Sequence, residues 1–245
     1  MNNPAVSTVF SLIIPAYNEV DRLPPYLDSV RGHLMQAFPD SHEVLVVDDG
    51  STDGTRQYVS RMAVQWPALR LVCHASNQGK GAAVRTGMLA AVGELRLFAD
   101  ADGATPIAEE SRLRAAIEAG ADVVIGSRRL QAPGVVRQRQ WFRGVVGWSF
   151  ARFIRCLLPI SVHDTQCGFK MFRRPAAEQL FALSQENGYV FDLELLVLAQ
   201  RLGYRVAEVG VNWIEMPGSK LHMSREWRKI LAGVGRIRRQ LRRPA

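Results

Sequence analysis

Residues 95–105 read LRLFADADGAT, and this stretch decides how the rest of the chain is interpreted. Its apolar first half predicts a buried strand that ends at Asp100 and Asp102, two carboxylates separated only by Ala101. In an extended segment residues i and i+2 point to the same side, so the two carboxylates can converge just beyond the strand. Paired oxygen ligands on a short turn favour Mg²⁺ or Mn²⁺, which bind carboxylates together with substrate phosphates. The alternative is a solvated turn, because Asp and Gly are common in turns.

Short apolar runs alternate with helical patterns through the first 130 residues. The runs predict strands at 9–14, 44–47, 69–73, 95–99 and 123–126, and the segments between them predict helices at 21–38, 52–62, 79–92 and 109–119. This alternation predicts an α/β fold with a doubly wound, mostly parallel sheet. Ligands of such sheets bind at the carboxyl ends of the strands, where polar clusters occur at 17–19, 48–49, 77–81, 100–102 and 128. The common position favours a nucleotide-type site over a solvated turn.

The second half of the chain is less regular. Residues 141–160 are aromatic-rich and contain three arginines, which fits a core helix or a helix lying in a membrane interface. Residues 163–170 predict a polar turn that leads into a helix near 176–183, followed by a helix at 191–202 and a strand at 204–211. From Arg225 onward a final amphipathic helix is predicted. Its apolar face comprises Trp227, Ile230, Leu231, Val234, Ile237 and Leu241.

The net charge of +8 is confined to the end of the chain. Residues 1–219 contain 22 basic and 22 acidic residues, whereas the last 26 residues contain nine basic residues and one acid, Glu226. Such a basic segment predicts an anionic partner: a membrane surface, a nucleic acid or a polyphosphate. The three cysteines are too few for a disulfide framework and fit a reducing compartment. No signal peptide or spanning helix is expected, so the protein is soluble or lies on a membrane.

Five short motifs occur in order along the first 130 residues: IPAYNE (14–19), VVDDGSTDGT (46–55), NQGKGAA (77–83), DADG (100–103) and GSR (126–128). Together they resemble the motif set of glycosyltransferase family 2. Three later motifs resemble the dolichyl-phosphate β-glucosyltransferase branch of that family: DTQCGFKMF (164–172), FDLELL (191–196) and PGSKL (217–221). The resemblance implies a GT-A fold, with a Rossmann-like central sheet flanked by helices and with amphipathic C-terminal helices. Residues 1–219 would form the transferase domain and 220–245 a basic helix of the same unit.

The resemblance also implies the ligands and their binding residues. They are a UDP-sugar donor, a divalent metal (Mg²⁺ or Mn²⁺) and a polyprenyl-phosphate acceptor, bound by a peripheral protein on the cytoplasmic face of the membrane. Asp102 would be the direct metal ligand, with Asp100 on the metal or the ribose. Pro15 and Tyr17 would flank the base, and Glu19 and Asp49 would accept hydrogen bonds from the ribose or uracil. The nucleotide-binding set is Pro15, Tyr17, Glu19, Asp49, Lys80, Asp100, Ala101, Asp102 and Lys220. As ordinary alternatives, Glu19 is a helix N-terminal acid and Lys80 a surface lysine.

The predicted catalytic set is Asp102, Arg128, Arg143, Asp164 and Asp192. The two arginines suit phosphate binding, because a guanidinium binds phosphate oxygens in a bidentate manner. An inverting transferase normally needs a carboxylate base, for which Asp164, Asp192 and Glu194 are the candidates. A phosphate monoester, however, has a second pKa near 6 and arrives as an oxyanion. It needs positioning by cations rather than a base, so we expect Asp164 and Asp192 to orient Arg or Lys side chains.

The predicted function is inverting, metal-dependent transfer of glucose from UDP-glucose to a polyprenyl phosphate at the membrane surface. Alternatives are a family 2 transferase with a soluble acceptor and a GDP-mannose-dependent polyprenyl-phosphate mannosyltransferase. From a different class, a sugar-1-phosphate nucleotidyltransferase is disfavoured because IPAYNE lacks the glycines of the N-terminal loop of those enzymes. A nucleic-acid binder is disfavoured because the carboxylates at the strand ends would repel phosphates in the absence of a metal.

Overall fold

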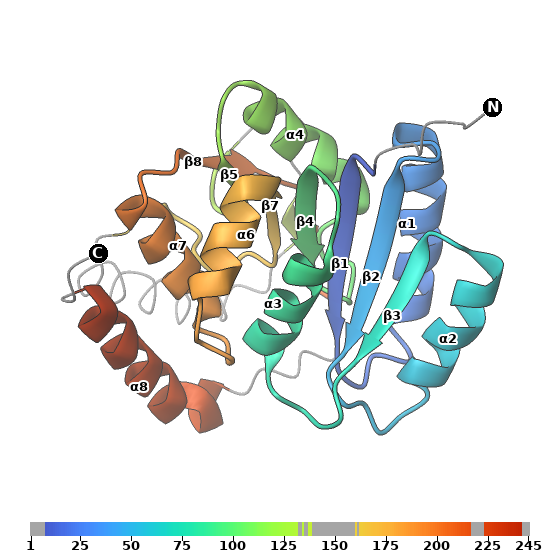
Figure 1. Cartoon of the computed structure of the whole chain (residues 1–245), viewed down its shortest axis with the longest axis horizontal. Coiled ribbons are helices and arrows are strands. Elements are labelled where there is room, and N and C mark those ends of the chain that lie inside the picture. Colours follow the sequence, from blue (N-terminus) through green and yellow to red (C-terminus); the bar gives the residue numbers. More distant parts are fainter. Residues whose placement is uncertain are drawn as a thin grey trace.

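A seven-stranded sheet lies at the centre of the molecule (Figure 1). The computed structural model describes residues 8–131, 134, 137–138, 160, 162–216 and 223–241. The strand order is β3-β2-β1-β4-β7-β5-β8, and only β7 runs antiparallel to its neighbours. The strands are β1 (Phe10–Ala16), β2 (His42–Asp48), β3 (Leu69–Cys73), β4 (Leu95–Ala99), β5 (Val123–Ser127), β7 (Phe169–Arg173) and β8 (Val206–Gly210). The short strands β6 (Arg137–Gln138) and β9 (Trp213–Ile214) pair separately.

Helices cover both faces of the sheet, as expected for a buried, mostly parallel sheet. One apolar cluster joins the sheet to α1 (Leu23–Ala37), α2 (Thr55–Gln65) and α4 (Glu110–Glu118), which follows the short 3₁₀ helix η1 (Ile107–Glu109). A second cluster joins the other face to α3 (Lys80–Ala90), α6 (Arg174–Leu183) and α7 (Phe191–Arg201). The strand β1 shows the alternation, because Leu12 and Ile14 belong to the first cluster and Ile13 to the second. The predicted α/β, mostly parallel architecture is confirmed.

Strand β7 was not predicted from the sequence. Residues 169–173 read FKMFR, and Lys170 interrupts the apolar pattern although its side chain is almost completely buried. The strand inserts between β4 and β5, with Ala99 opposite Phe169. Because β7 is antiparallel, its amino end meets the carboxyl end of β4. The residues just before β7 therefore lie beside the Asp100–Asp102 turn.

The final helix, α8 (Met223–Leu241), packs against α7 rather than standing apart from the domain. Ile230, Val234 and Ile237 are buried in a third apolar cluster together with Leu193 and Val197 of α7. Leu231 is 43% exposed, and the side chains of Trp227 and Leu241 lie outside the described residues. Half of the predicted apolar face thus covers the domain. Within the described part of the chain, no helix combines the length and apolar character needed to cross a bilayer.

Candidate active site

The turn Asp100–Asp102 directly follows β4, at the edge of the sheet where the parallel strands end. The backbone N–H of Asp100 donates to the carbonyl of Gly168 (3.0 Å), which anchors the turn to the chain that enters β7. A Cβ atom at position 168 would overlap the Asp100 carboxylate, so only glycine leaves room for this side chain. The N–H of Ala104 donates to Oδ1 of Asp102 (3.1 Å). These contacts fix the spacing of the two carboxylates.

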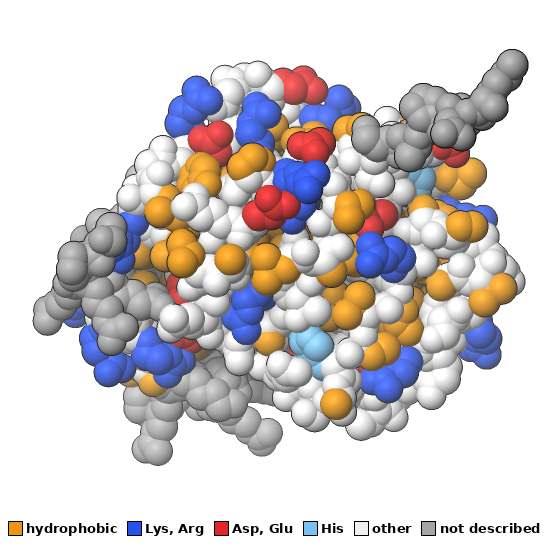
Figure 2. Space-filling model, viewed as in Figure 1, with side chains coloured by type: hydrophobic (Ala, Val, Ile, Leu, Met, Phe, Trp, Pro, Cys, Tyr) orange, Lys and Arg blue, Asp and Glu red, His pale blue; other side chains and the backbone are white. Residues whose placement is uncertain are grey.

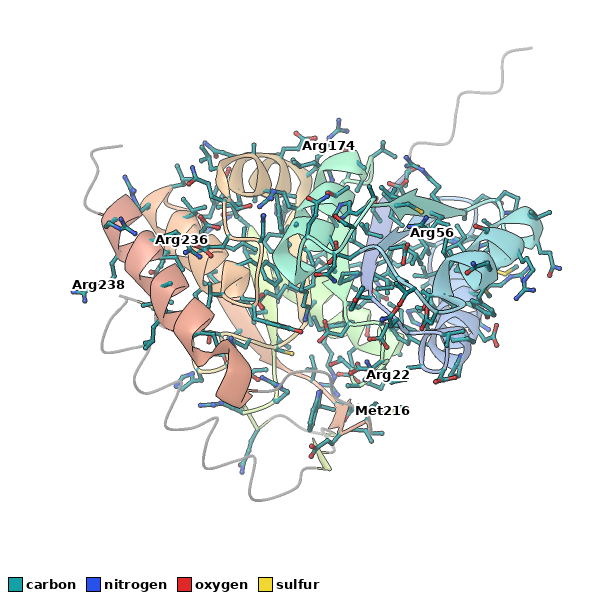
Figure 3. All side chains as sticks on the ribbon, turned by 90° about the horizontal axis from the view of Figure 1, so that it is seen from below. Arg22, Arg56, Arg174, Met216, Arg236 and Arg238 are labelled. Carbon is teal, nitrogen blue, oxygen red and sulfur yellow. The ribbon has the colours of Figure 1, made fainter. Side chains whose placement is uncertain are left out.

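Two basic side chains flank the carboxylates of this turn. Lys80 Nζ lies 2.5 Å from Asp100 Oδ1, and Arg22 Nη1 lies 3.6 Å from Asp102 Oδ2. The second separation exceeds hydrogen-bond length, so Asp102 is held less tightly by a cation than Asp100 is. Burial by itself would lower the pKa of Lys80, but the Asp100 and Asp192 carboxylates raise it, so the lysine stays charged. Figure 3 shows Arg22 from the side on which the strands end.

The residues of the turn fit a divalent cation. Burial, and next the charge of Asp100, raise the pKa of Asp102, although the charges of Arg22 and Lys80 oppose the shift. The Tyr26 hydroxyl is buried nearby without a hydrogen-bond partner among the described residues, and burial together with these carboxylates raises its pKa. The described residues contain no group of three or more His, Cys, Asp or Glu side chains arranged to hold a metal. Asp100 and Asp102 would therefore supply only part of the ligand shell, and substrate phosphates would supply further ligands. Mg²⁺ is commonly bound in this way.

The motifs IPAYNE (14–19) and VVDDGSTDGT (46–55) are joined by hydrogen bonds at the site. Asn18 Oδ1 accepts a hydrogen bond from the N–H of Thr52 (2.8 Å), and the N–H of Glu19 donates to Thr55 Oγ1 (2.8 Å). Pro15 is buried in β1, whereas Tyr17 is 39% exposed. Glu19 is paired with both Nε and Nη2 of Arg22, at 2.7 and 2.5 Å. Its carboxylate therefore orients Arg22 toward Asp102, and its predicted hydrogen bond to the nucleotide stays a prediction.

Asp49 holds the loop that leads into α3. Its Oδ1 accepts hydrogen bonds from His74 Nδ1 (2.7 Å) and the N–H of Gln78 (2.9 Å), and its Oδ2 accepts from the N–H of Gly79 (2.8 Å). Both oxygens thus have protein donors, and a direct bond to ribose or uracil stays a prediction. What the geometry establishes is that Asp49 places the backbone just before Lys80. Sequence reasoning missed His74, whose lone position after β3 carried no motif.

Arg128 and Asp164 form a rigid pair at the end of β5. Arg128 Nε and Nη2 each lie 2.8 Å from one oxygen of Asp164, and the N–H of Arg128 also donates to Oδ2 (2.9 Å). Burial alone would raise the pKa of Asp164, but the Arg128 guanidinium lowers it to about 2. The guanidinium also lies 5.6 Å from the centre of the Trp213 ring, within cation–π range. Arg128 is therefore held with its side chain 31% exposed at the site.

Asp192 and Glu194 are also engaged by protein donors. Asp192 pairs with Lys170, whose Nζ additionally donates to the carbonyl of Cys167 (2.7 Å). Glu194, completely buried, accepts hydrogen bonds from the N–H groups of Gln185 and Glu186. All three carboxylates considered as bases thus have cationic or backbone partners, in the orienting arrangement expected for Asp164 and Asp192. Arg143 and Lys220, two further predicted site residues, lie outside the described residues.

Known proteins resemble this chain in sequence over most of its length. The family model for glycosyl transferase family 2 matches residues 11–181. A dolichyl-phosphate beta-glucosyltransferase from Dictyostelium discoideum is 37% identical over 230 residues, covering 89% of this chain and 70% of the relative. The human protein of the same name is 35% identical over 225 residues, covering 86% and 69%.

Solved structures share the fold at lower sequence identity. Glucosyl-3-phosphoglycerate synthase from Mycobacterium tuberculosis, in complex with phosphoglyceric acid, superposes with a TM-score of 0.68 at 21% identity and covers 94% of this chain and 79% of that one. A mannosyltransferase from Pyrobaculum calidifontis, in complex with GDP-Man and Mn²⁺, gives 0.62 at 23% identity and covers 96% and 65%. These likenesses show the GT-A fold. The family model over residues 11–181, together with the relatives at 37% and 35% identity, establishes that the protein belongs to glycosyltransferase family 2.

Proposed function

We propose that this glycosyltransferase transfers glucose from UDP-glucose to the phosphate of a polyprenyl phosphate. The dolichyl-phosphate beta-glucosyltransferases that match most of the chain support the sugar and the acceptor class. The observation that carries the proposal is the engagement of Asp164, Asp192 and Glu194 by protein donors. A site whose candidate bases are all occupied suits an acceptor that arrives already ionised, and a phosphate monoester is such an acceptor.

The donor diphosphate would bind between the Asp100–Asp102 turn and the first turn of α3. Asp102 would be the direct ligand of Mg²⁺ or Mn²⁺. Asp100 would contact either the metal or the ribose while it stays paired with Lys80. When bound, the metal would act as a Lewis acid that neutralises charge on the departing UDP. Lys80 lies within reach of the same diphosphate because its Nζ already contacts Asp100 at 2.5 Å. Tyr17, exposed at the end of β1, would pack on the base beside Pro15.

The acceptor phosphate would be positioned by Arg128. An acceptor oxygen attacks C1 of the glucose, the bond from C1 to the β-phosphate oxygen breaks, and the electron pair of that bond leaves with UDP. Attack from the face opposite UDP inverts the configuration at C1. The pair with Asp164 fixes Arg128 before the acceptor binds, so little freedom is lost in forming the complex. Arg143 and Lys220 remain proposed phosphate contacts.

The donor can be identified by its effect on thermal stability. A ligand that binds the native state stabilises it in proportion to the logarithm of its concentration over Kd. We expect UDP-glucose with Mn²⁺ to raise Tm more than GDP-mannose with Mn²⁺ at equal concentration, because the relatives are named as glucosyltransferases. Measuring both shifts with and without EDTA separates the metal-dependent part. A larger shift with GDP-mannose would contradict the proposed donor and favour a mannosyltransferase.

We also propose that α8 contacts the membrane through its basic, exposed side. Figure 2 shows basic side chains gathered over this helix, and Arg238 and Arg239 are exposed in its last turn. Near an anionic bilayer each such residue contributes about 1 kcal/mol, and the effect is screened by salt. Because Ile230, Val234 and Ile237 pack on the domain, the contact is electrostatic rather than an insertion of that apolar stripe.

Co-sedimentation with anionic vesicles tests this contact. We expect binding at low salt that declines as salt rises, and a clear loss in the double variant Arg238→Glu, Arg239→Glu. The triple variant Gln57→Glu, Ser60→Glu, Arg61→Glu on the exposed side of α2 changes net charge equally and serves as the control. Equal loss in the two variants would show that net charge, and not α8, drives binding.

A further inference from the structure

Residues 184–190, the connection between α6 and α7, contact the first turn of α3. The N–H groups of Gly81 and Ala82 donate to the carbonyl of Asn187, at 2.7 and 3.3 Å. Amides in the first turn of a helix have no partner within the helix, so this carbonyl completes the start of α3. A Cβ at Gly81 would overlap the carbonyl oxygen of Glu186, which shows how closely the two backbones approach. The connection is thus fixed against the residues that directly follow Lys80.

Helix α7 also holds the 184–190 connection, through hydrogen bonds from the backbone of the connection to a carboxylate of α7. The buried carboxylate of Glu194 accepts the N–H of Gln185 at 2.9 Å and that of Glu186 at 2.8 Å. Two charge-assisted hydrogen bonds to consecutive amides define the path of the backbone at this point. Glu194 therefore shapes the connection, a role that its place in the FDLELL motif did not reveal.

Helix α8 holds the connection from its outer side. Arg236 Nε and Nη2 lie 2.6 and 2.7 Å from the two oxygens of Glu186, whose side chain is only 5% exposed. Gly233 packs against Val190, and Val190 shares an apolar cluster with Ile230, Val234 and Ile237. Figure 3 shows Arg236 directed from α8 toward the body of the protein, whereas Arg238 points outward.

We propose that Arg236 is a positioning residue for donor binding, acting through Glu186 and Asn187 on the start of α3. Docking of α8 holds the 184–190 connection, which holds the first turn of α3, and Lys80 is thereby kept beside Asp100. Arg236 pairs with Glu186. The next residue, Asn187, accepts the N–H groups of Gly81 and Ala82. Lys80, which directly precedes Gly81, contacts Asp100 at 2.5 Å, so the path is continuous. The donor-binding part rests on the proposed function of Lys80, whereas the mechanical coupling does not.

Hydrogen exchange in the full-length chain tests the coupling without any ligand. We expect the amides of Gly81 and Ala82 to exchange at least about fivefold faster in Arg236→Gln than in the wild type, the lower range of typical coupling between sites. The matched control is Arg238→Gln, which removes the same charge from the exposed side of the helix and should leave both amides unchanged. Equal exchange in the wild type and Arg236→Gln would overturn the proposal.

Kinetics with the donor varied then test the consequence for the site. We expect the KM for UDP-glucose to rise by at least about fivefold in Arg236→Gln, with kcat nearly unchanged, and Arg236→Lys to recover part of the loss. The variant Glu186→Gln should reproduce the effect, and the double variant should add little, because both changes remove one interaction. Additive effects, or an unchanged KM despite faster exchange, would overturn the positioning role. If the wild type does not use UDP-glucose at all, the proposed function fails, and the exchange experiment still decides the coupling.

Discussion

Asp102→Asn should lower turnover by about 10²–10³-fold at saturating UDP-glucose and Mn²⁺, the loss typical of removing one electrostatic contact to developing charge. The asparagine has nearly the same shape, and its Oδ1 can still accept the hydrogen bond that the N–H of Ala104 gives to Asp102. It lacks the negative charge that a divalent cation requires. The fold should remain intact, so the change isolates the metal ligand.

Binding of UDP provides the second readout of this variant. In calorimetric titrations, we expect Mn²⁺ to increase the affinity of the wild type for UDP. We expect no such increase in Asp102→Asn. The control is Asp28→Asn on the exposed side of α1, which makes the same chemical change outside the site. A variant at position 102 that keeps near-normal turnover and Mn²⁺-dependent UDP binding would show that the metal is held elsewhere.

Most of the carboxyl edge of the sheet could be predicted from the sequence because each part of it is local. In segments such as VVDD and LFADAD, the change from apolar to acidic residues marks where the strand ends. Parallel strands bring those ends to one edge. The positions of Asp49, Asp100 and Arg128 follow from this rule without knowledge of any long-range contact.

The partners of these residues could not be predicted, because they come from distant parts of the chain. Gly168 meets Asp100 only because β7 inserts antiparallel between β4 and β5. The buried Lys170 interrupts the apolar pattern that would have marked that strand, and its partner Asp192 lies on α7. Arg22 stands in an ordinary helix start, and nothing in the sequence distinguishes it from a solvated arginine.

Helix α8 shows a different limit of sequence reasoning. An apolar stripe beside arginines predicts an amphipathic helix, but the stripe can face a membrane or a protein core equally well. The structure buries Ile230, Val234 and Ile237 on the domain and pairs Arg236 with Glu186. The choice depends on the apolar surface that α7 presents, which only the assembled fold reveals.

A phosphate acceptor would account for the fixed cations at the site. Arg128 is held at the edge of the sheet, whereas the candidate bases Asp164 and Asp192 are committed to Arg128 and Lys170. A hydroxyl acceptor would need a base to remove its proton, and a phosphate acceptor would not. The second large effect we expect is therefore a near-complete preference for a phosphorylated acceptor over the alcohol from which it derives.

The most direct test of the account is transfer of labelled glucose from UDP-glucose to matched acceptors, with Mn²⁺ present. The acceptors are a polyprenyl phosphate, the corresponding polyprenol and soluble 3-phosphoglycerate, each in the same detergent. We expect labelled polyprenyl-phosphate glucose at a rate at least about 10²-fold above transfer to the hydroxyl group of either alternative, since a hydroxyl acceptor lacks the general-base assistance that commonly contributes this much. Equal or faster transfer to the polyprenol or to 3-phosphoglycerate would contradict the account.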